Sequence, residues 1–135
     1  MNRRQLINQQ RIIAETIRSY ESKSDVMEYI SMIAEELLPV ELPTECRIAG
    51  CLSDTYFRAH IGTDGFIRIE GSSQSIIMRG VIKLMADALN DCDAETIKEI
   101  GITWVNDAGL LDMLTPQRQG AIRQMAERIY RACGI

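Results

Sequence analysis

The chain has 135 residues, of which 46% are apolar and 25% charged, and its formal net charge is −4. These proportions are ordinary for a globular protein of about one domain, so we expect residues 1–135 to form a single domain. Basic residues are mixed with acids and aromatic residues are few, which argues against a nucleic-acid partner. No apolar run approaches the length needed to span a membrane, so no membrane partner is expected either.

The four cysteines and the one histidine are the residues best suited to carry chemistry. No apolar segment follows the charged N-terminus, so we expect no secretory signal and predict reduced thiols in a cytoplasmic compartment. Cys46 and Cys51 are close in sequence, Cys92 is expected at a partly exposed helix junction, and Cys133 on the buried face of the last helix. A structural zinc site shows two close ligand pairs, so neither a metal nor another cofactor is predicted.

Apolar residues recur at helical spacing through the N-terminal third. They predict one helix from about Arg4 to Tyr20 and a second whose apolar stripe runs over Met27–Leu37. Pro39 and Pro43 then predict an extended segment, because proline restricts both its own backbone and that of the residue before it.

Alternating apolar and polar residues predict a β-hairpin over residues 55–70, with an odd-length, glycine-containing loop between its strands. Residues 47–49 are a further candidate strand, so about three strands are expected. His60 falls on the polar row of the hairpin, and we interpret it as an exposed strand residue. A cysteine-dependent hydrolase would need that histidine beside a reactive thiol.

The remainder of the chain is predicted to be helical. Gly71–Ser73 is expected to close the hairpin and cap the next helix, in which Gly80 allows another backbone to come close. Asp93 caps a short helix, and Thr115–Pro116 begins the last one. Arg118 lies in the first turn of that helix, where the helix dipole disfavours a cation. It is either a solvated arginine or one placed to meet an anion or a thiolate.

The stretch Thr44–Ser53 joins the helical third to the hairpin and carries two of the four cysteines. A thiol that follows a glycine at such a junction is expected on a loop, where a partner can reach it. We interpret Cys51 as a sulfur-handling nucleophile. A reachable thiolate can attack the outer sulfur of a persulfide without a metal.

Four features occur in a fixed order along the chain: Ile48-Ala49-Gly50-Cys51-Leu52-Ser53, a glycine-containing hairpin, Ile77-Met78-Arg79-Gly80, and Leu114-Thr115-Pro116-Gln117-Arg118-Gln119-Gly120. Their order resembles the SufE-type sulfur acceptors of iron–sulfur cluster assembly. The resemblance implies an α+β fold, in which several helices pack on one face of a small antiparallel sheet, as in SufE and IscU.

The same resemblance implies a function. Cys51 would accept sulfur from a pyridoxal-phosphate-dependent cysteine desulfurase of the SufS type, stimulate that enzyme, and deliver the sulfur to a SufBCD-like scaffold complex. The protein would be an acceptor and activator rather than a stand-alone enzyme. Gly50 and Ser53 correspond to the loop neighbours of the acceptor, and Arg118 to the family's arginine near it. A second copy of the chain is a further candidate partner, in a homodimer.

Three positions depart from the family pattern. Cys46 stands where the family usually has asparagine, Tyr56 where it has tryptophan, and Gln74 where it has an acid. We interpret Cys46 as a half-buried small residue, with the alternative that it is a second thiol that resolves or relays a persulfide. The alternative function for the whole chain is an iron–sulfur or zinc-binding scaffold without sulfur transfer, which requires three or more ligands to converge.

Overall fold

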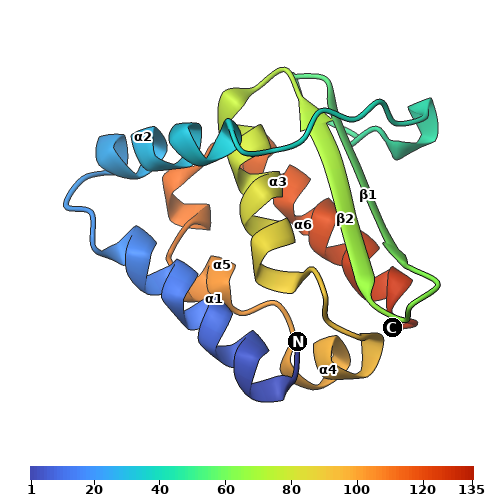
Figure 1. The fold of residues 1–135 in the computed structure, drawn as a ribbon. Helices are drawn as coiled ribbons and strands as arrows, with labels where there is room; N and C mark the ends of the chain where they lie inside the picture. Colours follow the sequence, from blue (N-terminus) through green and yellow to red (C-terminus); the bar gives the residue numbers. More distant parts are fainter.

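The computed structural model describes residues 1–135, and it is an α+β fold as predicted (Figure 1). The elements in chain order are α1 (Arg3–Arg18), α2 (Lys23–Ala34), η1 (Thr44–Cys46), β1 (Thr55–Ile61), β2 (Ile67–Ser73), α3 (Ile76–Leu89), α4 (Ala94–Ile100), α5 (Trp104–Asp107), η2 (Leu111–Met113) and α6 (Pro116–Ala132). None of the helices is both long and apolar enough to cross a membrane.

The two strands form an antiparallel hairpin whose register agrees with the prediction. Ile61 pairs with Ile67 across a connection of five residues, 62–66, which has the expected odd length. The alternate residues of both strands therefore share one buried face. On the other face Arg58 pairs with Glu70, with 2.8 Å between Nη2 and Oε1.

The expected third strand is reduced to a single bridge, between Arg47 and Tyr56, so the sheet has two strands. The amide of Ile48 still donates to the carbonyl of Thr55 at 2.8 Å. The chain then turns away at Gly50, whose φ of +73° is a left-handed conformation that other residues rarely adopt. This turn ends the pairing before a third strand can form.

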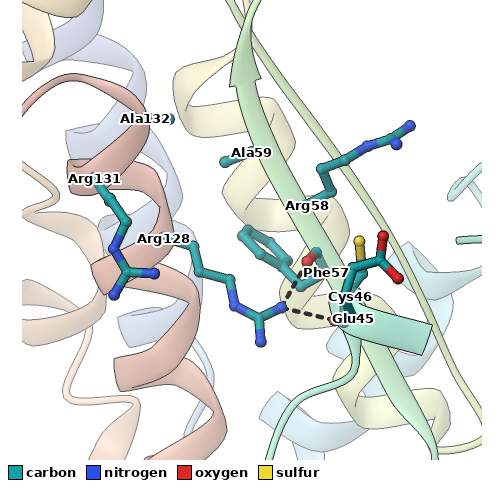
Figure 2. A pocket seen from close by; sticks show the side chains of 8 residues that line it. All are labelled: Glu45, Cys46, Phe57, Arg58, Ala59, Arg128, Arg131 and Ala132. Carbon is teal, nitrogen blue, oxygen red and sulfur yellow. Dashed lines mark hydrogen bonds between the residues drawn. The ribbon is translucent and has the colours of Figure 1, made fainter. Parts of the chain in front are cut away.

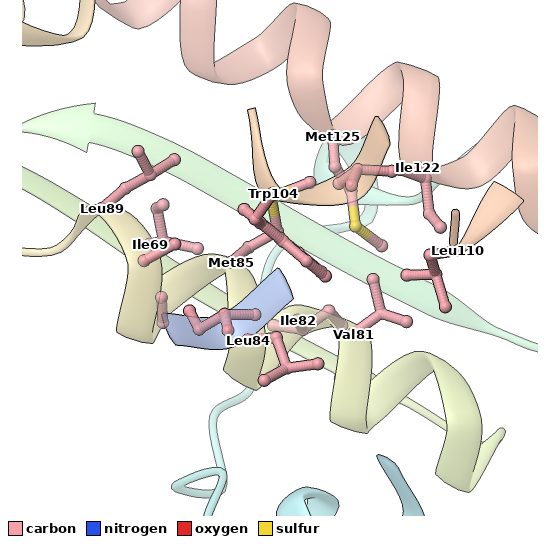
Figure 3. Packing of buried hydrophobic residues seen from close by; sticks show 14 of the residues in the cluster. Ile69, Val81, Ile82, Leu84, Met85, Leu89, Trp104, Leu110, Ile122 and Met125 are labelled. Atoms are coloured by element: carbon pink, nitrogen blue, oxygen red, sulfur yellow. The ribbon is translucent and has the colours of Figure 1, made fainter. Parts of the chain in front are cut away.

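The hairpin is covered on one face by α3 and α6. Helix α3 packs against β2 and α6 against β1, and α1 and α2 lie on the side of α3 away from the hairpin (Figure 1). Apolar side chains from these elements form one continuous core. Figure 3 shows its centre, where Trp104 and Met85 lie among Val81, Leu110 and Met125.

Helices α2 and α3 approach each other closely at Gly80, as predicted. A Cβ atom at this position would lie 2.2 Å from the carbonyl oxygen of Ile30, well inside van der Waals contact. Only a residue without a side chain permits this crossing.

Side-chain caps begin the predicted helices, with one correction. Asp93 accepts from the amide of Thr96 and begins α4, while Thr115 accepts from the amide of Arg118 and begins α6. The cap of α3 is Ser75, because Gly71–Ser73 belongs to β2. The strand runs further than its apolar alternation indicated.

Two further expectations were wrong. Helix α2 ends at Ala34 rather than near Leu37, because the last turns tighten and the amide of Leu37 bonds back to Ala34. Cys92 is fully buried rather than partly exposed. Its carbonyl accepts the amide of Ile67 at 2.8 Å, so the start of β2 lies against it.

Candidate functional site

Cys51 lies on the loop between η1 and β1, which has a fixed base and a free tip. At the base, Arg47 and Asp54 form an ion pair at 2.7 Å, and the carbonyl of Asp54 accepts the amide of Gln74 at 3.0 Å. At the tip, the backbone amides of residues 50–53 donate no hydrogen bond within the chain. The thiol is therefore carried by four residues that can move without breaking backbone pairing.

The thiol of Cys51 is half-buried and lies against the start of β1. Its Sγ is 3.5 Å from Oγ1 of Thr55, and that hydroxyl also donates to the carbonyl of Ser53 at 3.2 Å. The same Oγ1 is 2.8 Å from Oγ of Ser73 on β2. A chain of hydroxyl groups thus links the thiol to the buried end of the hairpin.

Cys51 and Arg118 line the same cavity, of about 280 Å³. The other lining residues come from the loop tip and from the starts of α3 and α6: Leu52, Ser53, Met78, Thr115 and Gln117. Arg118 takes part in none of the ion pairs of the chain. Its charge is therefore free to interact with an anion in the cavity, such as a thiolate or a persulfide.

Helix α6 also holds the loop from outside the cavity. The side-chain amide of Gln124 accepts the backbone N–H of Ala49 at 3.0 Å and donates to the carbonyl of the same residue at 2.7 Å. One turn further along, the guanidinium of Arg128 donates to three backbone carbonyls, those of Cys46, Arg47 and Phe57, at 2.7 to 2.9 Å. Figure 2 shows the bonds to Cys46 and Phe57.

Cys46 lies in a different cavity, of about 290 Å³, between η1, β1 and α6 (Figure 2). Arg58, Arg128 and Arg131 line it, together with Glu45 and apolar side chains. The hydrogen bond that Arg58 donates to Glu70 raises the pKa of Arg58 above its usual value. The cavities of Cys46 and Cys51 share no lining residue, so the two thiols open to different cavities.

None of the other candidate ligands and bases lines the Cys51 cavity. His60 is exposed and five residues along β1 from Thr55, which is about 17 Å at the rise of a strand. Cys92 and Cys133 are buried in the core. No three His, Cys, Asp or Glu side chains form a group that could hold a metal ion. Within one chain there is neither a cysteine–histidine pair nor the ligand set that a scaffold needs.

A family model described as "SufE: Fe-S metabolism associated domain" matches residues 11–133. The chain belongs to the SufE family. Membership supports a role in iron–sulfur metabolism and confirms the family that the motif order predicted.

Two further similarities agree with this SufE-family assignment. An uncharacterized SufE-like protein of Synechocystis sp. is 29% identical over 72 residues, which are 53% of this chain and 45% of that protein. The match therefore spans less than half of that relative. The solution structure of a hypothetical protein from Thermus thermophilus superimposes with a TM-score of 0.70 at 16% identity, over 94% of this chain and 97% of the other. That likeness supports the fold.

Two of the departures from the SufE pattern lie near the loop. Tyr56 is half-buried on β1, and Gln74 is exposed just after β2. Gln74 contacts the loop through its backbone amide, which bonds to Asp54. This contact does not depend on the side chain, so the missing acid leaves the base of the SufE-family loop intact.

Several residues around the site were not predicted from the sequence. Met78 and Gln117 complete the cavity, and Thr55, Gln124 and Arg128 hold the loop. The sequence contained one usable signal, the Thr115–Pro116 helix start, which places Arg118 in the first turn of α6. The motif resemblance placed Arg118 near Cys51, but no local pattern connects Gln124 or Arg128 to the loop.

Proposed function

We propose that the protein is a persulfide carrier that takes sulfur from a cysteine desulfurase onto Cys51 and passes it on for iron–sulfur cluster assembly. The thiolate of Cys51 attacks the terminal sulfur of the enzyme's persulfide. A new S–S bond forms on Cys51, the old S–S bond breaks, and the enzyme's cysteine leaves as a thiolate. Atoms and charge balance, and no net oxidation or reduction takes place.

The observation that carries this proposal is the cavity shared by Cys51 and Arg118. A persulfide is more acidic than a thiol and would be held there as an anion. A guanidinium without a carboxylate partner stabilises such an anion. Arg118 would therefore hold the sulfur once it has been transferred to Cys51.

The loop suits a transfer between two proteins. The thiol is half-buried at rest, which shelters a persulfide from water and stray thiols, while the tip lacks the backbone bonds that would fix it. The neighbouring Leu52 is 84% exposed, an unusual position for a large apolar side chain beside a reactive group. We propose that Leu52 is covered when the desulfurase docks, and that Cys51 then moves outward to meet the persulfide.

Gly50 and Ser53 would act through the shape of the loop. Gly50 adopts the left-handed turn that presents the thiol, and any other residue there would be strained by roughly 1 kcal/mol or more. Ser53 lines the cavity, and its carbonyl accepts a hydrogen bond from the hydroxyl of Thr55.

The test is sulfur transfer in a purified system. The protein is mixed with a pyridoxal-phosphate-dependent cysteine desulfurase and cysteine, and the site of added sulfur is found by mass spectrometry of alkylated peptides. We expect one sulfur atom on Cys51, and a faster desulfurase in the presence of the protein. Cys51→Ser should abolish both effects.

Cys46→Ser is the matched control, because it makes the same substitution five residues away in the other cavity. It should retain sulfur uptake and stimulation. Full stimulation by Cys51→Ser, or sulfur found only on Cys46, would show that the proposal is wrong.

A further inference from the structure

The cysteine loop is held along the length of one helix. The first turn of α6 supplies Arg118 to the Cys51 cavity, while Gln124 and Arg128 lie further along the same helix and hold the base of the loop. The thiol of Cys51 thus comes from the loop and the cation from α6. The position of the loop relative to α6 depends on the side chains of Gln124 and Arg128.

Gln124 makes a two-point contact with a single residue. It both accepts from and donates to the backbone of Ala49, two residues before Cys51, at 3.0 and 2.7 Å. Such a pair of bonds fixes orientation as well as distance, because the amide must lie in the plane of both partners. It fixes the loop immediately before the free tip begins.

Arg128 fixes the loop to the sheet as well as to α6. Its guanidinium bonds the carbonyls of Cys46 and Arg47 on the loop side and that of Phe57 on β1. It forms no ion pair with any carboxylate of the chain. The planar fork of donors, rather than the charge alone, makes this arrangement, so lysine cannot reproduce it.

We propose that Gln124 and Arg128 are positioning residues that keep the Cys51 thiol beside Arg118. They touch neither the sulfur nor a substrate. They act by holding residues 46–49 against α6, so that the free tip starts from a base at a fixed distance from the cation. Loss of either contact should leave the fold intact and allow the thiol to drift away from Arg118.

The test measures the positive charge at Cys51 directly. Iodoacetate and iodoacetamide both alkylate the thiolate, so the ratio of the iodoacetate rate to the iodoacetamide rate does not depend on the fraction of thiolate. Iodoacetate is negatively charged, so a nearby cation raises this ratio. In the wild type the ratio should exceed that of a free small thiol by about threefold to fivefold, as expected for one cation near a partly exposed anion. Arg118→Met should bring the ratio down to that of the free thiol.

Gln124→Met and Arg128→Lys should lower the same ratio by about threefold, although neither substitution changes the charge of the protein. Arg123→Lys is the matched control, since Arg123 is exposed on α6 and contacts neither the loop nor the cavity; it should keep the wild-type ratio. A general loss of stability would lower the melting temperature without altering this ratio in folded protein.

A second readout rests on the proposed function. In the sulfur-transfer assay both variants should lower the maximal rate, because a thiol that has drifted away from Arg118 accepts sulfur less well. An unchanged alkylation ratio in either variant overturns the assignment of that residue, and an unchanged ratio in Arg118→Met overturns the proposal as a whole. Failure of Cys51 to accept sulfur would refute the proposed function but not the alkylation result.

Discussion

Thr55 connects the reactive thiol to the folded core through its hydroxyl group. The residue is fully buried, and its Oγ1 contacts Cys51, Ser53 and Ser73. Thr55→Val keeps the shape but removes the hydroxyl, which leaves polar groups of its neighbours without a partner. We expect the free energy of unfolding to fall by about 1–3 kcal/mol, the usual cost of an unsatisfied buried group. Urea denaturation followed by circular dichroism measures it.

The control for Thr55→Val is Ser72→Ala. Ser72 lies on the same hairpin, is only half-buried, and makes no side-chain hydrogen bond. Its removal should change the free energy of unfolding by less than about 0.5 kcal/mol. Equal effects of the two substitutions would mean that the hydroxyl network contributes nothing beyond the local loss of a side-chain oxygen.

At the site, the sequence could indicate residue types but not most contacts. Cys51 and Arg118 were singled out because a thiol after glycine and a cation in a first helical turn are both unusual. Gln124 and Arg128 were missed because their partners are backbone groups, and the amide and carbonyl bonded by Gln124 lie 75 residues away. Every residue has such groups, so no local pattern marks the ones that will be used.

Among the elements, the crossing of α2 over α3 sets the strictest demand on a single position. Alanine favours helices over glycine by about 1 kcal/mol, yet at Gly80 its Cβ would overlap the backbone of Ile30. We therefore expect Gly80→Ala to destabilise the protein by about 1–3 kcal/mol, the usual cost of overpacking a core. Thermal and urea unfolding measure the change.

Gly120→Ala is the matched opposite case. Gly120 lies inside α6, and a Cβ there would meet no atom within 4 Å. The same substitution should therefore stabilise the protein by about 0.5–1 kcal/mol through helix propensity and the unfolded state. If Gly80→Ala also stabilised the protein, helix propensity rather than the crossing would govern Gly80.

The helices and the hairpin were predictable because their signals are local. The Thr115–Pro116 start of α6 and the parity of the hairpin register follow from backbone chemistry over a few residues. The prediction of a third strand was wrong because strand pairing depends on tertiary contacts. The left-handed turn at Gly50 directs the chain away from β1 after a single bridge. The extended segment through Pro39 was expected, but the elements it packs against were not. Proline restricts the backbone dihedral angles and does not determine tertiary contacts.

On the scale of the whole molecule, the site lies at an edge of the core rather than apart from it. Cys51 packs against the core cluster, and fully buried Met78 of α3 forms part of its cavity. The loop, the hairpin and the starts of α3 and α6 therefore share one folding unit. Global stability and the geometry of the site should be measured together in every variant, so that one is not mistaken for the other.

Two thiols in the core make stability depend on alkaline pH. Cys92 and Cys133 are 0% and 3% exposed, and burial raises the pKa of each above the ordinary value of 9.0. For Cys92 the N-terminal amino group opposes the shift while Asp93 and Asp91 add to it, and for Cys133 Lys98 opposes it. Above the ordinary value the unfolded chain loses these protons and the folded chain keeps them, so unfolding is favoured as pH rises.

We therefore expect the free energy of unfolding to fall from about pH 9 upward, until the pH reaches the raised pKa values of the folded state, by up to about 1.4 kcal/mol per pH unit for each thiol. The measurement is urea denaturation between about pH 8 and pH 10.5 with a reductant present. Tyr29, whose pKa is also raised by burial, contributes in the same direction. The comparison that isolates the thiols is the slope of wild type against that of Cys92→Ala with Cys133→Ala. The double variant will be less stable at every pH because of its cavities, but its alkaline slope should be shallower. Identical slopes would show that the core admits the thiolates without cost, and that the two cysteines are not held neutral by burial.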